Sequence, residues 1–278
     1  MKRLLSLLAL FALSSTALAD DALKAAIAGS HRSPANVARD AARHPYETLS
    51  FFGIRPDMTV VELNPGGGWY TEILAPYLRD KGVLYEATFS ASSDEPRKRA
   101  ATERFQKKLN ELPAVYGKVK LSVFDPPKAL AIAPAASADM VLTFRNVHNW
   151  IDPADATLKA VFKHAFDTLK PGGIFGVVDH RLPEDRPQDA TASTGYVHAS
   201  YVIKLAEGAG FKLAAQSDIN ANPKDTADHP EGVWTLPPVY ALKDKDRAKY
   251  EAIGESNRFT LKFVKPGAGP VESTPKNP

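Results

Sequence analysis

The chain alternates between two hydrophobic patterns along most of its length. Short apolar runs are typical of buried strands, whereas apolar residues three and four apart are typical of helices that cover a sheet. These patterns predict seven strands, at residues 59–63, 82–89, 119–124, 138–144, 174–178, 211–217 and 259–264. The predicted helices span residues 34–44, 46–52, 69–79, 94–112, 153–169, 200–209 and 244–252.

Alternation of strand and helix favours an α/β fold built on a Rossmann-like, doubly wound sheet. Strands joined by crossover helices run parallel, so we predict a seven-stranded sheet that is mostly parallel. The last two strands flank a proline-rich insert at residues 220–257 instead of a crossover helix. We therefore predict that the last strand lies antiparallel to its neighbour.

The first nineteen residues have the pattern of a signal peptide. Lys2 and Arg3 precede an apolar stretch at residues 4–13, which is shorter than a membrane span, and Ala17–Ala19 fits the small-x-small cleavage rule. We predict cleavage after Ala19, no stable membrane span after that cleavage, and a periplasmic or secreted mature protein. An uncleaved amphipathic anchor is the alternative.

The rest of the chain divides into segments of different character. We predict site-capping helices at residues 20–53, a main domain at 54–266 and a disordered tail at 267–278. The insert at 220–257 is a substrate-specific lid, a long surface loop or a dimer contact.

Composition excludes several classes of function. The chain has no cysteine, which rules out disulfides, thiolate metal sites and cysteine nucleophiles. Without Lys2 and Arg3, the 35 basic residues become 33 against 32 acidic ones, so no basic surface for nucleic acid is expected. No metal site is predicted either, because no histidine or acid cluster has ligand spacing. The expected partner is a small molecule, and the sequence does not indicate an oligomeric state.

A glycine run carries the first chemical signal. Val60, Val61 and Leu63 form the apolar core of a predicted strand, and residues 66–68 are all glycine before a predicted helix begins. Glycine lets a backbone turn sharply and approach a ligand closely. A strand, a glycine loop and a helix in this order predict a small-molecule site at the carboxyl edge of the sheet.

Further short motifs stand at fixed places around the predicted strands. Residues 53–58 lead into Val61–Gly68, and Asp125 follows the third strand. Residues 138–141 lie in the fourth strand with 146–150 after it, and 169–173 precede the fifth strand. With this order and spacing, residues 53–266 resemble the class I S-adenosylmethionine-dependent methyltransferases. The segments 33–45, 178–181 and 255–261 are similar to a bacterial group of exported "predicted" methyltransferases, for which no substrate is established.

The resemblance implies S-adenosylmethionine as cofactor and a set of contacts to it. It places Glu62 near the methionine amino group, Gly66 and Gly68 where the backbone approaches, and Asp125 near the adenine. The cofactor-binding residues that we predict are Glu62, Asn64, Gly66, Gly67, Gly68, Glu86 and Asp125.

Two positions depart from the family pattern. Asn64 stands where the family has its first glycine, and asparagine tolerates unusual backbone dihedrals better than most residues. Thr88 stands at the tip of the second strand, where the family usually has an acid for the ribose. Glu86 lies two residues earlier, on the same face of the second strand. It replaces the family's acid only if the register of this strand is shifted by two residues.

Three residues are candidates for catalysis: His148, Asn146 and His180. His148 follows the fourth strand, and an imidazole titrates in the range that a general base needs. Asn146 orients an acceptor through its amide, unless it is a turn residue. His180 stands between Asp179 and Arg181 at the end of the fifth strand. This trio binds an anionic acceptor or, as we slightly favour, forms an internal ion pair.

Other residues allow functional and structural interpretations. Arg39 and Arg43 share a helix face that reaches over the site or, as we favour, is solvated. His148 itself caps its loop or packs on Trp150 if it is not catalytic.

We predict methyl transfer to an unidentified small-molecule acceptor. An alternative is a non-catalytic exported binding protein that keeps the fold, because S-adenosylmethionine is not expected to be made outside the cytoplasm. A nicotinamide oxidoreductase ranks lower. Glu86 lies twenty residues after Gly66, but the glycine run does not complete the G-x-G-x-x-G fingerprint.

Overall fold

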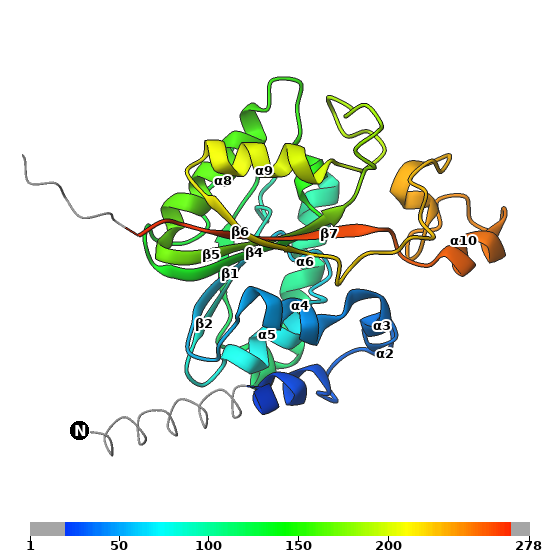
Figure 1. Cartoon of the computed structure of the whole chain (residues 1–278). Coiled ribbons are helices and arrows are strands. Elements are labelled where there is room, and N and C mark those ends of the chain that lie inside the picture. Colours follow the sequence, from blue (N-terminus) through cyan, green and yellow to red (C-terminus); the bar gives the residue numbers. More distant parts are fainter. Residues whose placement is uncertain (1–19, 268–278) are drawn as a thin grey trace, which may run out of the picture.

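The computed structural model describes residues 20–267, which fold around one seven-stranded sheet (Figure 1). The strand order is β3-β2-β1-β4-β5-β7-β6, and β7 is antiparallel to both of its neighbours. The strands are β1 Thr59–Leu63, β2 Val83–Thr88, β3 Lys120–Val123, β4 Ala138–Phe144, β5 Leu169–His180, β6 Lys212–Ser217 and β7 Arg258–Val264. The predicted fold class and the antiparallel last strand are confirmed. The predicted signal peptide and most of the predicted tail lie outside the described residues.

Helices cover both faces of the sheet, as doubly wound topology requires. They are α2 Pro34–Val37, α3 Asp40–Arg43, α4 Pro45–Phe52, α5 Thr71–Leu78, α6 Pro96–Glu111, α7 Pro113–Tyr116, α8 Ala156–Thr168, α9 Ala199–Gly208 and α10 Arg247–Ile253, with short 3-10 helices η1 Val147–Trp150 and η2 Gly232–Thr235. One core layer packs α8 and α9 on the sheet, and the other packs α4, α5 and α6 on the opposite face. Residues 20–27 are also helical.

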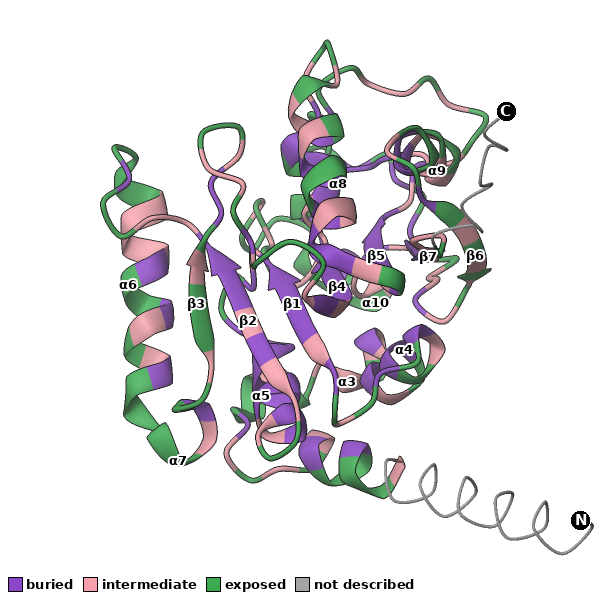
Figure 2. Ribbon diagram, turned by 90° about the vertical axis from the view of Figure 1, so that its left-hand side faces the viewer, coloured by how far each residue is buried: buried purple, intermediate pink, exposed green. Residues whose placement is uncertain are grey.

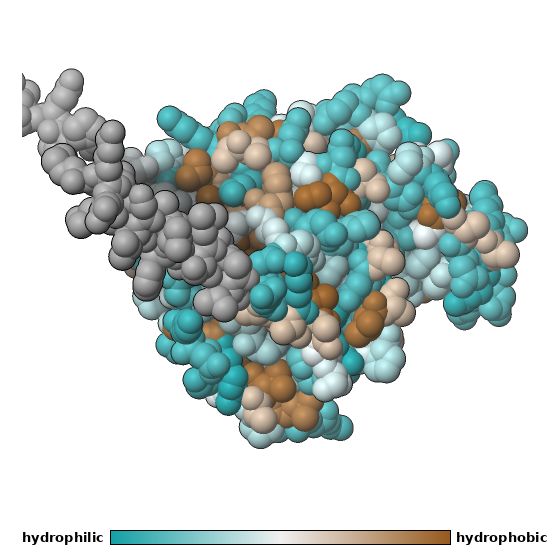
Figure 3. Space-filling model, turned by 60° about the horizontal axis from the view of Figure 1, so that its bottom comes forward, coloured by the Kyte–Doolittle hydropathy of each residue, from teal (hydrophilic) through white to brown (hydrophobic). Residues whose placement is uncertain are grey.

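The central strands are the most buried part of the molecule. Four of the five residues of β1 and six of the seven residues of β4 are buried, because helices cover both of their faces. Figure 2 shows these strands in purple, whereas the edge strand β3 is largely exposed. Apolar residues are scattered among hydrophilic ones on the described part of the face in Figure 3. The central strand ends are therefore held by a rigid core, which fixes the loops that follow them.

Most element boundaries differ from the prediction by one to three residues, and two elements differ more. The helix predicted at 34–44 is two short helices, and the indole nitrogen of Trp69 donates to the carbonyl of Asn36, near the end of α2, at 2.9 Å. Strand β5 begins at Leu169, five residues early. Leu169 pairs with Ala138 of β4, and a register shift between Ala138 and Met140 accommodates the extra residues.

The insert at 220–257 lies at the carboxyl end of the parallel strands, the same end as α2 and α3 (Figure 1). Within residues 20–267, no helix combines the length and the apolar character needed to cross a membrane. The carboxyl edge of the sheet is thus covered by segments from both ends of the described chain.

Candidate functional site

The glycine loop between β1 and α5 adopts the backbone conformation that its sequence predicts. Asn64, Gly66 and Gly68 have φ of +48°, +61° and +76°, in the left-handed region that glycine and asparagine tolerate best. Asn64 thus adopts the left-handed backbone that the sequence analysis expected it to tolerate.

The three glycines have different surroundings. A Cβ added at Gly66 or Gly67 would meet no atom within 4 Å, so their backbone faces open space. A Cβ at Gly68 would lie 2.9 Å from the ring of Phe105 on α6, which makes this glycine a packing residue. Lys108 of α6 donates to the carbonyl oxygens of Gly67 and Gly68 at 2.9 and 3.3 Å and holds the loop. The expected close approach is therefore available at Gly66 and Gly67, and Gly68 serves the loop's packing instead.

A first pocket of about 380 Å³ opens beside the loop. Its walls combine aromatic rings with a few polar side chains: Asn64, Gly66, Thr88, Phe89, Lys98, Ala101, Pro126, Asn146, Asn149 and Trp150. Two aromatic rings thus stand among five polar side chains, which suits a small molecule that has both a ring and polar groups. Thr88 lines this pocket at the strand tip, where sequence counting placed it.

A second pocket of about 180 Å³ adjoins the first and is strongly polar. It shares Asn64, Gly66 and Asn146 with the first pocket, and Glu62 lies in its wall. Three arginines line it as well: Arg39, Arg43 and Arg145. The two pockets meet at the glycine loop, so one elongated ligand or two adjacent ligands fit across it.

Glu62 and Glu86 face each other across β1 and β2 in exact register and are both buried. Burial raises the pKa of Glu62 to about 7, opposed by the hydroxyl of Thr71 and the charge of Lys108. Burial and the neighbouring Glu62 charge raise the pKa of Glu86 well above its ordinary value. Glu62 reaches the second pocket, whereas Glu86 lines neither of the two pockets beside the loop.

Two predicted residues are held by internal contacts. Asp125 forms an ion pair with Lys98 at 2.7 Å. Lys98 and Pro126 line the first pocket, whereas Asp125 does not. The amide nitrogen of Asn146 donates to the carbonyl of Leu63 at 2.9 Å and to the hydroxyl of Thr143 at 3.1 Å. Asn146 thus ties the ends of β1 and β4 together while its side chain lines both pockets.

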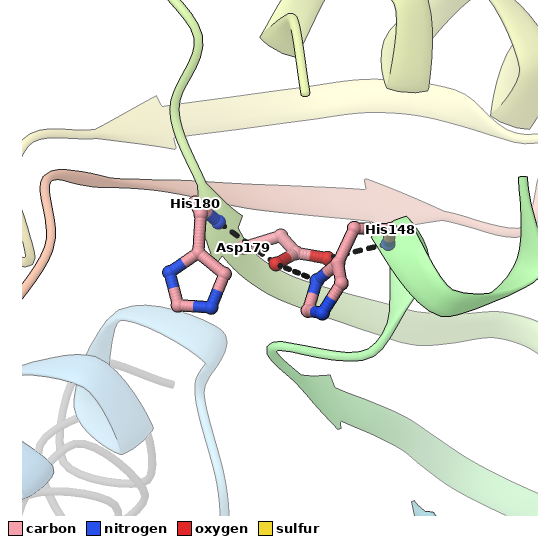
Figure 4. A group of neighbouring side chains, drawn as sticks. All are labelled: His148, Asp179 and His180. Atoms are coloured by element: carbon pink, nitrogen blue, oxygen red, sulfur yellow. Dashed lines mark hydrogen bonds and ion pairs between the residues drawn. The ribbon is translucent and has the colours of Figure 1, made fainter. Parts of the chain in front are cut away.

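His148 forms a buried dyad with Asp179 (Figure 4). The Nδ1 atom of His148 lies 2.9 Å from Asp179 Oδ1, and the backbone N–H of His148 donates to Oδ2 at 3.0 Å. Burial raises the pKa of Asp179, but the charge and hydrogen bond of His148 outweigh burial and lower it below its ordinary value. An ionised carboxylate only accepts hydrogen bonds, so Nδ1 of His148 carries a proton, and in the neutral form of the ring Nε2 is the nitrogen that accepts one.

His180 lies next to this dyad, with its ring centroid 5.1 Å from that of His148. Its backbone N–H donates to Asp179, and its Nδ1 lies 2.6 Å from the hydroxyl of Ser256. Burial lowers the pKa of His180 well below its ordinary value, which keeps the ring neutral near pH 7. Figure 4 shows both imidazoles extending to the same side of β5.

The sequence did not predict how these three residues gather. His148, Asp179 and His180 offer ligand atoms within 4.8 Å of one another, a spacing that suits a metal ion. Both carboxylate oxygens of Asp179 already accept hydrogen bonds, however, which favours the dyad. The signal in the sequence was the position of each residue just after β4 or at the end of β5, because adjacent parallel strands bring their carboxyl ends together. The ion pair that we favoured within Asp179, His180 and Arg181 does not form, because Asp179 pairs with His148 and Arg181 pairs with Asp218.

The favoured prediction of a solvated face for Arg39 and Arg43 is wrong. Arg43 is 1% exposed, and its guanidinium lies 4.7 Å from the ring of Trp69. Both arginines pair with Glu255, Arg39 at 2.6 Å and Arg43 at 3.2 Å. Glu255 lies 212 residues after Arg43, so no local pattern could reveal this contact.

Comparison with solved structures shows which fold the chain has. A S-adenosylmethionine-dependent methyltransferase from Aquifex aeolicus is 15% identical, with a TM-score of 0.55 over 84% of this chain and 94% of that one. Geranyl diphosphate C-methyltransferase from Streptomyces coelicolor A3(2), crystallised with S-adenosyl-L-homocysteine, is 13% identical, with a TM-score of 0.53 over 82% of each chain. The [4+2]-cyclase SpnF is 15% identical, with a TM-score of 0.54 over 82% of each chain.

No family model matches the chain, and no curated protein matches it in sequence. The chain therefore has the methyltransferase fold, while its assignment to an exported bacterial group stays a prediction. Because a cyclase has the same fold, the reaction has to be argued from the site.

Proposed function

We propose that the protein transfers the methyl group of S-adenosylmethionine to a small-molecule acceptor. The observation that carries this proposal is the glycine loop, whose two open positions, Gly66 and Gly67, face space that a Cβ would fill. The fold shared with methyltransferases supports the same assignment.

The residues around the loop fit the two ends of this cofactor. The aromatic walls of the first pocket, with Phe89 and Trp150, suit an adenine ring, and the hydroxyl of Thr88 suits a ribose contact. Asn64 has a buried side-chain oxygen without a hydrogen-bond partner among the described residues, which suits the ammonium of an amino acid together with Glu62. Glu86 and Asp125 are less suited to direct contact than predicted, because Glu86 is fully buried and Asp125 is paired with Lys98.

When bound, S-adenosylmethionine supplies an electrophilic methyl group on a sulfonium, so the protein mainly has to position the acceptor and exclude water. An acceptor that is protonated at neutral pH also needs a base. The Nε2 atom of His148 takes that role, since Asp179 fixes the ring and stabilises the positive charge that the imidazole gains. Trp234 of the insert lies against His148, with ring centroids 6.1 Å apart, and helps to shield the base from water.

Location outside the cytoplasm is a second part of the proposal. It rests on the signal-peptide pattern at residues 1–19. Mass spectrometry of the protein recovered from the periplasm or the medium should give a first residue at Asp20. An intact Met1 on membrane-bound protein would contradict export with cleavage.

Calorimetric titration with S-adenosylmethionine and S-adenosylhomocysteine tests the proposed reaction. We expect saturable binding of both ligands. If neither ligand binds at millimolar concentration, the protein is a binding protein that has kept the fold, and the role given to His148 falls with the methyl transfer.

A further inference from the structure

The second pocket has an unusual excess of positive charge. Arg39, Arg43 and Arg145 line it, and Arg258 is buried behind them within the same ion-pair cluster. Glu255 is the acid that pairs with three of these four arginines. Even with Glu62 ionised in the pocket wall, four positive charges stand against two negative ones.

Several guanidinium nitrogens in this pocket have no hydrogen-bond partner among the described residues. They are one terminal nitrogen of Arg39 and both terminal nitrogens of Arg43, and all three are buried. Buried donors nearly always find a partner in folded proteins, because an unmade hydrogen bond leaves the full desolvation cost. The side chain of Arg145, which is only partly buried, lines the pocket and makes no hydrogen bond or ion pair to any residue between 20 and 267.

The positive charges of the arginines also repel one another, which destabilises the charged form of each guanidinium. Burial lowers the pKa of Arg43 to about 9, and the charges of Arg145 and Arg39 act in the same direction. Burial lowers the pKa of Arg145 to about 10, opposed by Glu255. An anion placed among these groups would relieve this repulsion and supply the missing acceptors at once.

We propose that the second pocket is an anion site, in which Arg39, Arg43 and Arg145 hold a carboxylate or phosphate group of the methyl acceptor. This inference rests on the proposed methyl transfer and names the class of its substrate. Arginine suits the role because its planar fork matches both kinds of oxyanion.

The cofactor has a carboxylate of its own, which is the other source of such an anion. The amino-acid end of S-adenosylmethionine, however, carries an ammonium beside the carboxylate, and its sulfonium adds a further positive charge. Binding of that end, with its ammonium on Glu62 and Asn64 as proposed above, adds no net negative charge and leaves the excess of arginine uncompensated. The acceptor's anion therefore fits the charge balance better.

One segment of the chain connects the pocket arginines to the histidine pair. Glu255 pairs with Arg39 and Arg43, and the next residue, Ser256, bonds to His180 beside His148. Burial is the main cause of the lowered pKa of His180, and the charges of Arg145 and Arg258 act in the same direction. An acceptor anchored on the arginines would thus be held by the segment that also contacts the histidine pair.

Titration with inorganic phosphate in a low-salt buffer tests the site. The unaltered protein should bind phosphate saturably, and Arg145→Gln should weaken the affinity by about tenfold or more, the usual effect of losing a charge-assisted hydrogen bond. Arg55→Gln is the matched control, because Arg55 is exposed near the opposite end of β1 and pairs with Asp57. Arg39→Gln serves as a second variant if Arg145→Gln lowers the unfolding midpoint.

Repeating the titration with saturating S-adenosylhomocysteine separates the two sources of the anion. Phosphate affinity that persists supports a site for the acceptor. Phosphate displaced by S-adenosylhomocysteine assigns the arginines to the cofactor's carboxylate and overturns the proposal. Phosphate that does not bind, or that binds equally to Arg145→Gln and Arg55→Gln, overturns it as well.

Failure of the proposed function gives a different result. If S-adenosylhomocysteine does not bind but phosphate does, methyl transfer is refuted. The acceptor assignment falls with it, while the anion site itself stands.

Discussion

The Gly66→Ala variant tests whether the glycine loop contacts the ligand, and it distinguishes that contact from the contribution of the loop to stability. Gly66 has φ of +61°, and a Cβ there meets nothing within 4 Å. The left-handed backbone costs an L-residue roughly 1–2 kcal/mol. No steric term adds to this cost in the free protein. At about 2–4 °C per kcal/mol for a chain of this size, the unfolding midpoint should fall by roughly 2–8 °C.

Binding should suffer more than stability does. The new methyl group would stand in the space that the cofactor needs, and overpacking of a close contact costs about 1–3 kcal/mol. Because 1.4 kcal/mol is a factor of ten, the affinity for S-adenosylhomocysteine should fall roughly five- to 150-fold in calorimetric titration.

Gly172→Ala is the matched control for this change. Gly172 has φ of +80°, and a Cβ there also meets nothing within 4 Å, but it lies near the start of β5, away from the site. Gly172→Ala should therefore lose similar stability and bind S-adenosylhomocysteine like the unaltered protein. If Gly66→Ala binds this ligand as tightly as Gly172→Ala does, the loop does not contact the cofactor and the reasoning is refuted.

Two further predictions concern buried acids. Because the pKa values of Glu62 and Glu86 are raised, the folded state keeps protons that the unfolded state loses above about pH 4.5. The free energy of unfolding is therefore highest below that pH and falls as the pH rises through about 7, the pKa of Glu62 in the folded state. Glu86→Gln imitates the protonated form and should raise the free energy of unfolding by about 1–3 kcal/mol at pH 8 and by little at pH 4.5; equal effects at both values in urea unfolding would contradict the shifted titration. Asp179→Asn should leave S-adenosylhomocysteine affinity unchanged but slow methyl transfer by roughly 10²–10⁴-fold, the usual contribution of a general base. An unchanged rate with a confirmed acceptor would exclude the dyad from catalysis.

Local sequence was sufficient for the elements and for the loop. The order of strands and helices, the turn at residues 64–68 and the place of Thr88 at a strand tip all depend on residues close together in the chain. Asn64 is an example. Its tolerance of a positive φ can be read from residue type alone, and the structure places it at +48°.

Contacts between distant segments could not be predicted in the same way. Helical spacing put Arg39 and Arg43 on one face, but that pattern does not tell a solvated face from one buried against a distant acid. The same limit applies to Glu86. Its position on the face of β2 was clear from the sequence, whereas its burial opposite Glu62 depends on the pairing of two strands.

The antiparallel last strand explains why the end of the insert belongs to the site and does not only cover it. A parallel strand begins at the amino edge of the sheet, but β7 runs the other way and begins at the carboxyl edge, where β1, β4 and β5 end. The residues just before and at its start therefore enter the site directly: Glu255 pairs with the pocket arginines, and Ser256 bonds to His180. An antiparallel last strand implies this location, but the sequence analysis did not assign Glu255 or Ser256 to the site. Changes at Glu255 should accordingly disturb ligand binding, whereas changes at the exposed tip of the insert, such as at Val239, should not.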